Sequence, residues 1–240
     1  MPRAIWKKSA AVLFAIVAAA CGGSDARAAS RSADTGAKVG ADQAVASTAS
    51  TAAKSPITDE RVKRADESRI KGSSSAKVWV VIASDFQCPY CKTWHDQTAA
   101  KLEEEYVANG KVRIAYVNFP LNQHPNARPS AEAAMCAGAQ GKFWEMHDKL
   151  FESVGEWGPL PDAGGVFSRL VKELALDGAA YDQCIKDHVM LPMIEGDRER
   201  AVQSGANSTP SFLIGGAILA GAQPIEQFRP VIDKALAGAK

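Results

Sequence analysis

The sequence predicts an α/β fold whose middle part is helical. Three observations carry this prediction: an apolar, β-branched run at 77–83, a second strand-like run at 111–119 beyond a helical stretch, and a glycine-centred hairpin at 211–220 that follows several helical patterns. The resulting order is β-α-β, then helices, then β-β-α. The net charge of the 240 residues is +1 and no basic block occurs, so nothing in the composition favours nucleic-acid binding.

Residues 1–21 have the layout of a secretory signal. Basic residues precede an unbroken run of small apolar residues at 10–20, which is too short to span a bilayer. The sequence around Cys21 is similar to a bacterial lipobox, in which this cysteine becomes lipid-modified, although Ala18 stands where leucine is usual. Ala-Arg-Ala at 26–28 offers an ordinary signal-peptidase site instead. Both routes predict an exported bacterial protein, in the periplasm or at the extracytoplasmic face of a membrane. The only membrane contact we expect is the lipid anchor on Cys21.

Residues 22–57 consist mostly of Ala, Ser, Thr, Gly and Asp, with hardly a large apolar side chain. Such a segment cannot bury enough surface to offset its ordering entropy, so we expect a disordered tether. A polar helical stretch over 58–70 follows, and Gly72 stops it. We therefore predict one folded domain at 58–240, with helices at about 125–200.

Residues 88–91, Cys-Pro-Tyr-Cys, place two thiols one helical turn apart where the strand at 77–83 gives way to a helix. Pro89 suits the first helical position, which needs no backbone donor. Cys88 is therefore expected at the amino end of the helix, where the macrodipole and free N–H groups favour a thiolate. We predict that Cys88 is the nucleophile and that Cys91, one turn further and more buried, is the resolving thiol.

The cysteine pair has two other interpretations. A Cys-x-x-Cys can be half of a zinc site, and His95 is a candidate third ligand. No second such pair follows at finger-like spacing, and the other histidines are scattered: His124, His147 and His188. A purely structural disulfide is disfavoured because bridging so short a loop contributes little chain entropy. We predict no metal ligands and no cofactor.

The composition gives 5 Cys, and both processing routes remove Cys21 from the thiol pool, which leaves an even set in an oxidising compartment. Cys136 and Cys184 are the second pair, in two helical patterns. They are about 48 residues apart, so a bridge would stabilise the fold by about 4 kcal/mol in the chain-entropy model. We predict a structural disulfide; the alternative is two buried free thiols, since geometry decides whether they can join.

The remaining elements follow from periodicity and turn signals. Five helical patterns lie at 128–139, 142–154, 162–174, 179–188 and 191–204. The hairpin strands, 211–214 and 217–220, flank a Gly-Gly turn suited to positive φ, and a helix over 225–237 follows.

Four stretches together resemble the DsbA-like thiol:disulfide oxidoreductases, and the resemblance covers nearly all of 56–240: SDFQCPYC at 84–91, FPL at 119–121, CAGAQGKFW at 136–144 and STPSF at 208–212. The resemblance implies a thioredoxin-like fold with an inserted all-helical subdomain. It also implies that Pro210 is cis and lies against the redox pair. Thr209 and Pro210, together with Pro89 and Tyr90, would then line the substrate groove.

The chain departs from this family at two positions. Ile82 stands six residues before Cys88, where many members have a buried carboxylate that helps to move the proton of the resolving thiol, and Asp85 is the nearest substitute. Tyr90 replaces the histidine that is common in strongly oxidising members, and tyrosine cannot stabilise a thiolate as a cation would.

The resemblance implies an exported enzyme that exchanges the Cys88–Cys91 disulfide with free thiols of folding secreted proteins. The leading hypothesis is an oxidase that a quinone-linked membrane oxidase regenerates. The second hypothesis is a periplasmic reductase or isomerase with the same site, kept reduced by a membrane electron donor. A third hypothesis, from a different class of function, is a tethered lipoprotein in which the cysteines and His95 bind copper(I) or zinc.

Overall fold

The computed structural model describes residues 59–239, and the predicted signal segment, Cys21 and the whole of the predicted tether at 22–57 lie outside this range. Within 59–239, no helix is both long and apolar enough to cross a bilayer. The α/β class and the order of elements predicted from the sequence are confirmed.

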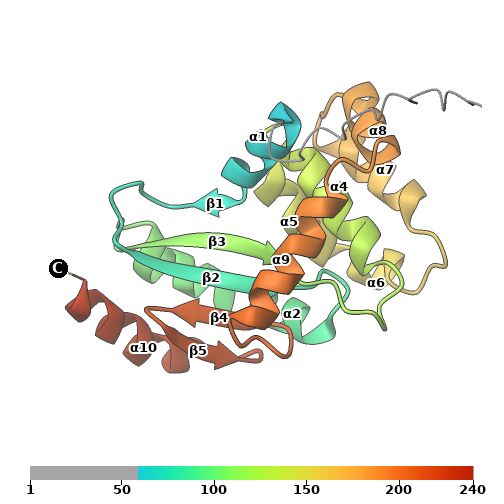
Figure 1. The fold of residues 1–240 in the computed structure, drawn as a ribbon. Helices are drawn as coiled ribbons and strands as arrows, with labels where there is room; N and C mark the ends of the chain where they lie inside the picture. The colour runs from blue at the N-terminus through green and yellow to red at the C-terminus, as the bar shows by residue number, and fades with distance from the viewer. Residues whose placement is uncertain (1–58, 240) are drawn as a thin grey trace, which may run out of the picture. The chain divides into compact units, whose positions relative to one another are not determined.

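The centre of the fold is a mixed sheet with strand order β1-β3-β2-β4-β5 (Figure 1). β2 (Val78–Ser84) and β3 (Val112–Asn118) run parallel, and β4 (Ser211–Ile214) and β5 (Ala217–Ala220) form an antiparallel hairpin on the other side of β2. β2 is thus paired on both sides, as its apolar sequence indicates. β1 (Ile70–Lys71) pairs antiparallel with β3 and was not predicted, because a strand of two residues has no periodicity to detect.

Gly215 and Gly216 form the hairpin turn at φ values of 55° and 86°, which glycine adopts without steric cost. A Cβ atom on Gly215 would also lie only 2.6 Å from Cβ of Ala235. Ala235 belongs to α10 (Ile225–Gly238), so the turn needs glycine both for its backbone and for the close approach of this helix.

The helix that follows β2 is not a regular α-helix. It consists of α2 (Pro89–Trp94), a π-helical segment η2 (His95–Ala99), α3 (Ala100–Leu102) and a second π segment η3 (Glu103–Val107). Its buried side chains recur every four residues: Trp94, Thr98, Leu102 and Tyr106. These segments and α10 cover one face of the sheet and enclose an apolar core with β2, β3 and β4.

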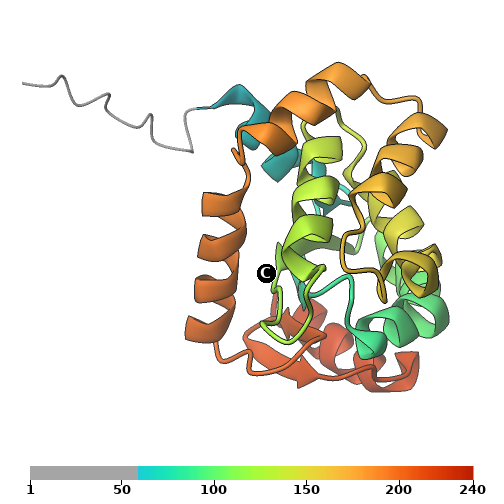
Figure 2. The same ribbon diagram turned by 90° about the vertical axis from the view of Figure 1, so that its right-hand side faces the viewer.

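Between the second strand and the hairpin the structure has the five predicted helices and one additional short helix. They are α4 (Ala127–Gly138), α5 (Phe143–Glu152), α6 (Val154–Trp157), α7 (Gly164–Glu173), α8 (Gly178–Lys186) and α9 (Leu191–Gln203). The additional helix is α6, and α4 to α8 gather at one end of the sheet (Figure 2). α1 (Glu60–Ser68) packs on α4, and α9 crosses over β3 on the sheet face opposite α10. A disulfide joins Cys136 of α4 to Cys184 of α8, with Cα atoms 5.8 Å apart.

A buried polar network fastens α9 to the sheet. The carboxylate of Asp197, which is 1% exposed, accepts hydrogen bonds from the side chain of Arg69 and from both the backbone and side-chain N–H groups of Asn118. Because Arg69 precedes β1 and Asn118 ends β3, one carboxylate holds three elements together.

Candidate active site

Cys88 and Cys91 lie where β2 passes into α2, and both are free thiols. Cys88 is the residue before the first helical turn and has extended backbone angles (φ −73°, ψ 123°), while Pro89 occupies the first helical position. Only 4% of Cys88 and 1% of Cys91 is exposed. Both cysteines belong to the apolar core of the helical subdomain, together with Phe86 and Tyr116, so the redox pair lies where the sheet and the inserted helices meet.

The surroundings of Cys88 favour its thiolate. A hydrogen bond from the Cys91 thiol is the largest cause, followed by Thr209 and by the backbone N–H groups of Cys91 and Tyr90; burial opposes them. Together they lower the pKa of Cys88 from 9.0 to about 6. These backbone donors lie in the first turn of α2, as expected for a cysteine at a helix amino end. At neutral pH Cys88 is therefore mostly ionised.

Cys91 behaves in the opposite way. Burial is the largest cause that raises the pKa of Cys91 well above 9.0. The hydrogen bond with Cys88 and the charge of Cys88 raise it further. Its Sγ accepts a 3.5 Å hydrogen bond from the backbone N–H of Asp85, and the Ser84 hydroxyl also favours its ionisation, but neither outweighs burial. The pair is thus divided into a thiolate and a protonated thiol, the division that attack by one sulfur and later resolution by the other require.

The loop before β4 contacts the first cysteine. The Thr209–Pro210 peptide bond is cis, and Sγ of Cys88 lies 3.5 Å from the carbonyl oxygen of Thr209, to which it donates when it is protonated. The backbone N–H of Gly221 donates to the carbonyl of Pro210 at 2.8 Å, which anchors the loop to the end of β5. The Thr209 hydroxyl is buried and has no partner while Cys88 is protonated, and it favours the Cys88 thiolate, to which it can donate.

Asp85 is the buried carboxylate nearest in sequence to the cysteines. Its two oxygens are bound to other groups, so its contacts do not favour a role as proton acceptor for Cys91. Its Oδ1 accepts from the backbone N–H of Gln87, and its Oδ2 accepts from that of Leu121 and lies 2.8 Å from Nδ1 of His124. The sequence had given His124 no role. Both oxygens are thus engaged in fixing the loops beside the redox pair. Nothing in the local pattern indicated a contact between residues 39 apart.

The remaining residues of the predicted groove differ in exposure. Tyr90 is 66% exposed and can contact a bound chain, whereas Phe86 and Trp94, the other aromatic residues near the site, are buried core residues. The side chain of Gln87 was missed by the sequence analysis. It donates to the carbonyl of Gly158 and accepts from the backbone N–H of Asn126, so it ties the redox loop to the helical subdomain.

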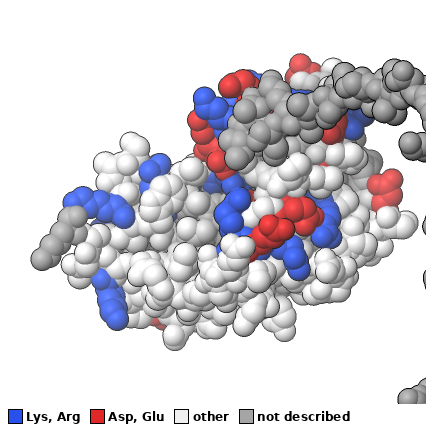
Figure 3. Space-filling view, in the orientation of Figure 1, with Lys and Arg blue, Asp and Glu red and all other residues white. Residues whose placement is uncertain are grey.

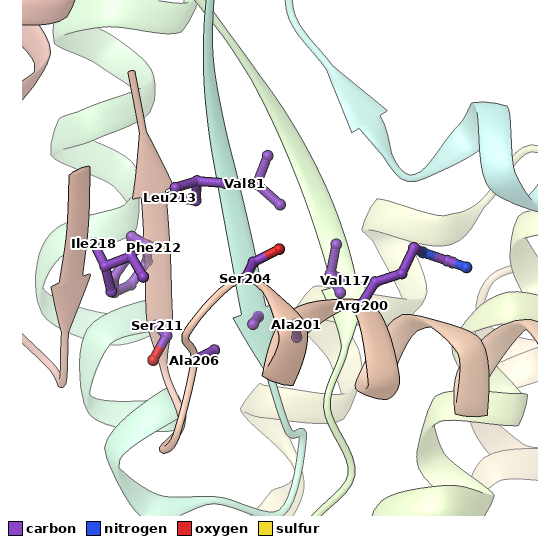
Figure 4. Close-up of a pocket in the computed structure, with 11 residues that line it drawn as sticks. Val81, Val117, Arg200, Ala201, Ser204, Ala206, Ser211, Phe212, Leu213 and Ile218 are labelled. Atoms are coloured by element: carbon purple, nitrogen blue, oxygen red, sulfur yellow. The ribbon is translucent and has the colours of Figure 1, made fainter. Parts of the chain in front are cut away.

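An apolar cavity of about 210 Å³ opens between the end of α9 and the sheet (Figure 4). Val81, Phe212 and Ile218 are among its lining residues, together with Arg200, its one charged residue, and Ser211, which follows Pro210 directly. No charged residue occurs at 203–225, and Figure 3 shows few charged side chains over the hairpin. This surface is suited to apolar contacts rather than to chemistry.

His95 does not turn toward the cysteines as the metal-binding interpretation requires. Its Nδ1 lies 3.1 Å from Oδ1 of Asp96 and its Nε2 lies 3.2 Å from Oδ1 of Asp148. Within the described range, the one group of side chains close enough to hold a metal ion contains neither cysteine. The contacts of His95 therefore do not favour a site made of Cys88, Cys91 and His95.

Comparison with known proteins gives a consistent result. The model of the thioredoxin family matches residues 64–234. The chain is 27% identical over 173 residues to the probable disulfide bond formation protein D of Bacillus anthracis, covering 69% of this chain and 76% of that protein. It is 32% identical over 176 residues to the Na(+)/H(+) antiporter NhaA 1 of Salinispora arenicola, and this match covers 73% of the chain but only 26% of the antiporter.

Among solved structures, the fold is similar to that of alpha-DsbA1 from Wolbachia pipientis, with a TM-score of 0.64. The superposition covers 71% of this chain and 92% of the other at 23% sequence identity, so it supports the fold. The chain thus spans most of the length of the disulfide bond formation protein, and about a quarter of the length of the antiporter.

Proposed function

Since the chain belongs to the thioredoxin family, within its DsbA-like group of thiol:disulfide oxidoreductases, we propose that Cys88 and Cys91 exchange a disulfide with thiols of client proteins. The observation that carries this proposal is the difference between the two thiols. Cys88 has a pKa of about 6 at the helix end, and Cys91 is a buried thiol with a raised pKa one turn further on.

The exchange proceeds in two steps that balance. A client thiolate attacks Cys88 Sγ of the oxidised pair, the bond between the two enzyme sulfurs breaks, and Cys91 leaves with the bonding electrons and takes up a proton. A second client thiolate then attacks the client sulfur of the mixed disulfide and releases Cys88 as a thiolate. The client loses two electrons and gains a disulfide, and the enzyme pair is reduced.

The stabilised thiolate favours the oxidase direction. Lowering the pKa of Cys88 from 9.0 to about 6 stabilises the reduced enzyme. At about 1.4 kcal/mol per unit the gain is at most about 4 kcal/mol, reached only above pH 9, and at pH 7 it is about 1.4 kcal/mol. Because 30 mV corresponds to about 1.4 kcal/mol for this two-electron couple, the potential rises by about 30 mV at pH 7 and by at most about 90 mV at high pH. Such a rise makes the disulfide a better oxidant.

The surface next to the site suits an unfolded client. A client chain that places its cysteine on Cys88 lies beside Thr209 and the uncharged hairpin, where the cavity at Ser211 accepts an apolar side chain. Proline at 210 has no N–H, so backbone pairing at this loop falls to the preceding residue. Folding proteins expose apolar segments, which fits such a surface.

The proposal includes the location and the partner expected from the sequence. An exported enzyme would receive its oxidising equivalents from a quinone-linked membrane oxidase, and a lipid on Cys21 would keep it near that membrane. The alternative, a reductase or isomerase, would need a membrane electron donor instead. The transport activity in the antiporter's name is not proposed for this chain.

The test is the equilibrium potential of the redox pair in the full chain, measured in glutathione buffers by alkylating the free thiols. We expect a potential well above the value of about −270 mV for thioredoxin. A potential at or below that value would replace the oxidase with the reductase. A pair that does not cycle at all would overturn the proposal.

A second measurement tests the roles of the two cysteines. Cys91→Ser should accumulate mixed disulfides with an unfolded client that contains a disulfide. The Cys88 thiolate attacks one client sulfur, the other client sulfur leaves as a thiolate, and no resolving thiol is present to release the client. Cys88→Ser should form none. Equal trapping by both variants would contradict the assignment of Cys88 as the reactive sulfur.

A further inference from the structure

Two histidines and an aspartate meet outside the thiol site, between α5 and the helix formed by α2, η2, α3 and η3 (residues 89–107), hereafter the redox helix. Nε2 of His95, the first residue of η2, lies 3.2 Å from Oδ1 of Asp148, and Nδ1 of His147 lies 2.7 Å from the same oxygen. Over residues 59–239, this is the only group of three such side chains whose ligand atoms all lie within 4.8 Å of one another.

The spacing is close to that of a coordination shell. Ligand atoms about 2.0–2.1 Å from a zinc ion lie about 3 Å apart at right angles and about 3.4 Å apart in a tetrahedron. The two distances to Asp148 Oδ1, 2.7 and 3.2 Å, need only small side-chain rotations to reach these values. The ligand nitrogens of the two imidazoles lie within 4.8 Å of each other, so these two atoms must move closer together by a larger distance.

The three side chains are supported as metal ligands usually are. Oδ1 of Asp96 lies 3.1 Å from Nδ1 of His95, which leaves Nε2 of that ring directed at Asp148. His147 is packed between aromatic rings, with those of Phe151 and Trp144 at centroid distances of 5.0 Å each. The Asp148 side chain is 48% exposed, so an ion can reach the group from solvent.

A cavity of about 220 Å³ adjoins the group and leaves room for water ligands. Lys71 also lines this cavity, but its ammonium group is paired with both oxygens of Glu103 at 2.8 and 3.0 Å, which compensates its charge. Glu152, one turn after Asp148 on α5, contributes a further carboxylate to the lining.

We propose that His95, His147 and Asp148 bind a divalent first-row transition-metal ion of the zinc class, which ties the redox helix to the helical subdomain. Imidazole nitrogen and carboxylate oxygen are the donors that such ions take, and three protein ligands leave a position for water. His95 follows Cys91 by one helical turn, and His147 and Asp148 belong to α5, so the ion would cross-link the two parts of the fold next to the active site. This site uses no thiol and does not depend on the proposed redox activity.

The test is Zn²⁺ binding to the full chain in its oxidised form, in competition with a chromophoric chelator. Oxidation joins Cys88 to Cys91, and a Cys21→Ser background removes the remaining free thiol, so no sulfur ligand is available. We expect one Zn²⁺ per chain. His95→Gln and Asp148→Asn should each lower the affinity by about tenfold or more, and Asp96→Asn, which only loses the orienting partner of His95, by less.

His188→Gln is the matched control. Nδ1 of His188 lies 3.0 Å from a carboxylate oxygen of Glu132, so it forms the same kind of pair without a third ligand, and it should leave the affinity unchanged. Circular dichroism checks that each variant is folded. If Asp148→Asn does not fold, His95→Gln and the cobalt(II) spectrum decide, because cobalt bound here shows ligand-field bands without thiolate charge transfer.

Two results would overturn the proposal. The absence of Zn²⁺ binding to the oxidised wild-type chain would mean that the group is only a hydrogen-bonded network. Equal binding by the wild type, His95→Gln and Asp148→Asn would place the zinc elsewhere in the chain.

Discussion

Replacing Thr209 by valine should raise the pKa of Cys88 by about one unit. Valine has the shape of threonine without its hydroxyl, and the Thr209 hydroxyl is buried with no partner in the reduced protein. After Cys91, Thr209 is the next largest cause that lowers the pKa of Cys88. The substitution therefore removes one donor to the thiolate and keeps the carbonyl oxygen of residue 209 in place.

The magnitude follows from the size of the whole shift. The pKa of Cys88 falls from 9.0 to about 6 through several donors, against the opposing effect of burial. A hydrogen bond to a charged group contributes roughly 1.5–3 kcal/mol, and one pKa unit is about 1.4 kcal/mol, so one unit is the conservative expectation. At pH 7 the thiolate fraction would fall from about 90% to about 50%. At the same pH the reduction potential would fall by about 20 mV.

The assay is the rate of Cys88 alkylation by iodoacetamide as a function of pH, with the reduced full chain. The rate follows the thiolate fraction, so its midpoint gives the pKa. Thr209→Ser is the control, because it keeps the hydroxyl and should stay near the wild-type midpoint. An unchanged midpoint in Thr209→Val, or an equal shift in both variants, would refute the role of the hydroxyl.

Three further outcomes are expected. The free energy of unfolding of the reduced chain, relative to that of the oxidised chain, should rise from pH 6 to 9. The lowered pKa of Cys88 stabilises the folded state fully above the unfolded pKa of the thiol, and this gain is lost as pH falls through about 6. Urea unfolding of both forms measures the difference, and an unchanged difference over this range would mean that the thiolate is not stabilised. Changing Cys136 and Cys184 to alanine should cost about 4 kcal/mol in urea unfolding of the folded domain, since the bridge closes a loop of 48 residues, and a loss below 1 kcal/mol would contradict the entropic argument. Asp197→Asn should destabilise by about 3 kcal/mol because it leaves the buried Arg69 without its buried partner, whereas an unchanged melting temperature would show that Asp66 alone suffices.

The parts of the fold that could be predicted depend on local patterns. The strand at 77–83, the proline-initiated helix and the Gly-Gly hairpin appear within a residue or a few of their predicted bounds, because periodicity and turn chemistry act over short stretches. Cys88 at the helix start followed from Pro89 for the same reason.

The parts that could not be predicted depend on contacts between distant residues. Asp85 meets His124 across 39 positions, and His95 meets Asp148 across 53. The sequence therefore offered His95 to the nearby cysteines as a third ligand, whereas the fold directs it to α5. Neither contact leaves a trace in the spacing of the residues around it.

The π segments of the redox helix have a consequence for how this chain can vary. Trp94, Thr98, Leu102 and Tyr106 follow one another at intervals of four, and in an α-helix of about 3.6 residues per turn each interval would turn the stripe by about 40°. The two wider π turns compensate this rotation, so all four side chains lie in one row against the sheet. The row forms only with the present number of residues between Cys91 and Tyr106. A one-residue deletion at 100–102, the α-helical part between the two π segments, would shorten the helix only slightly. It would nevertheless rotate the cysteines by about 100° relative to the buried residues downstream, since each residue of an α-helix advances by that angle. Substitutions in this helix should therefore be tolerated far more often than insertions or deletions.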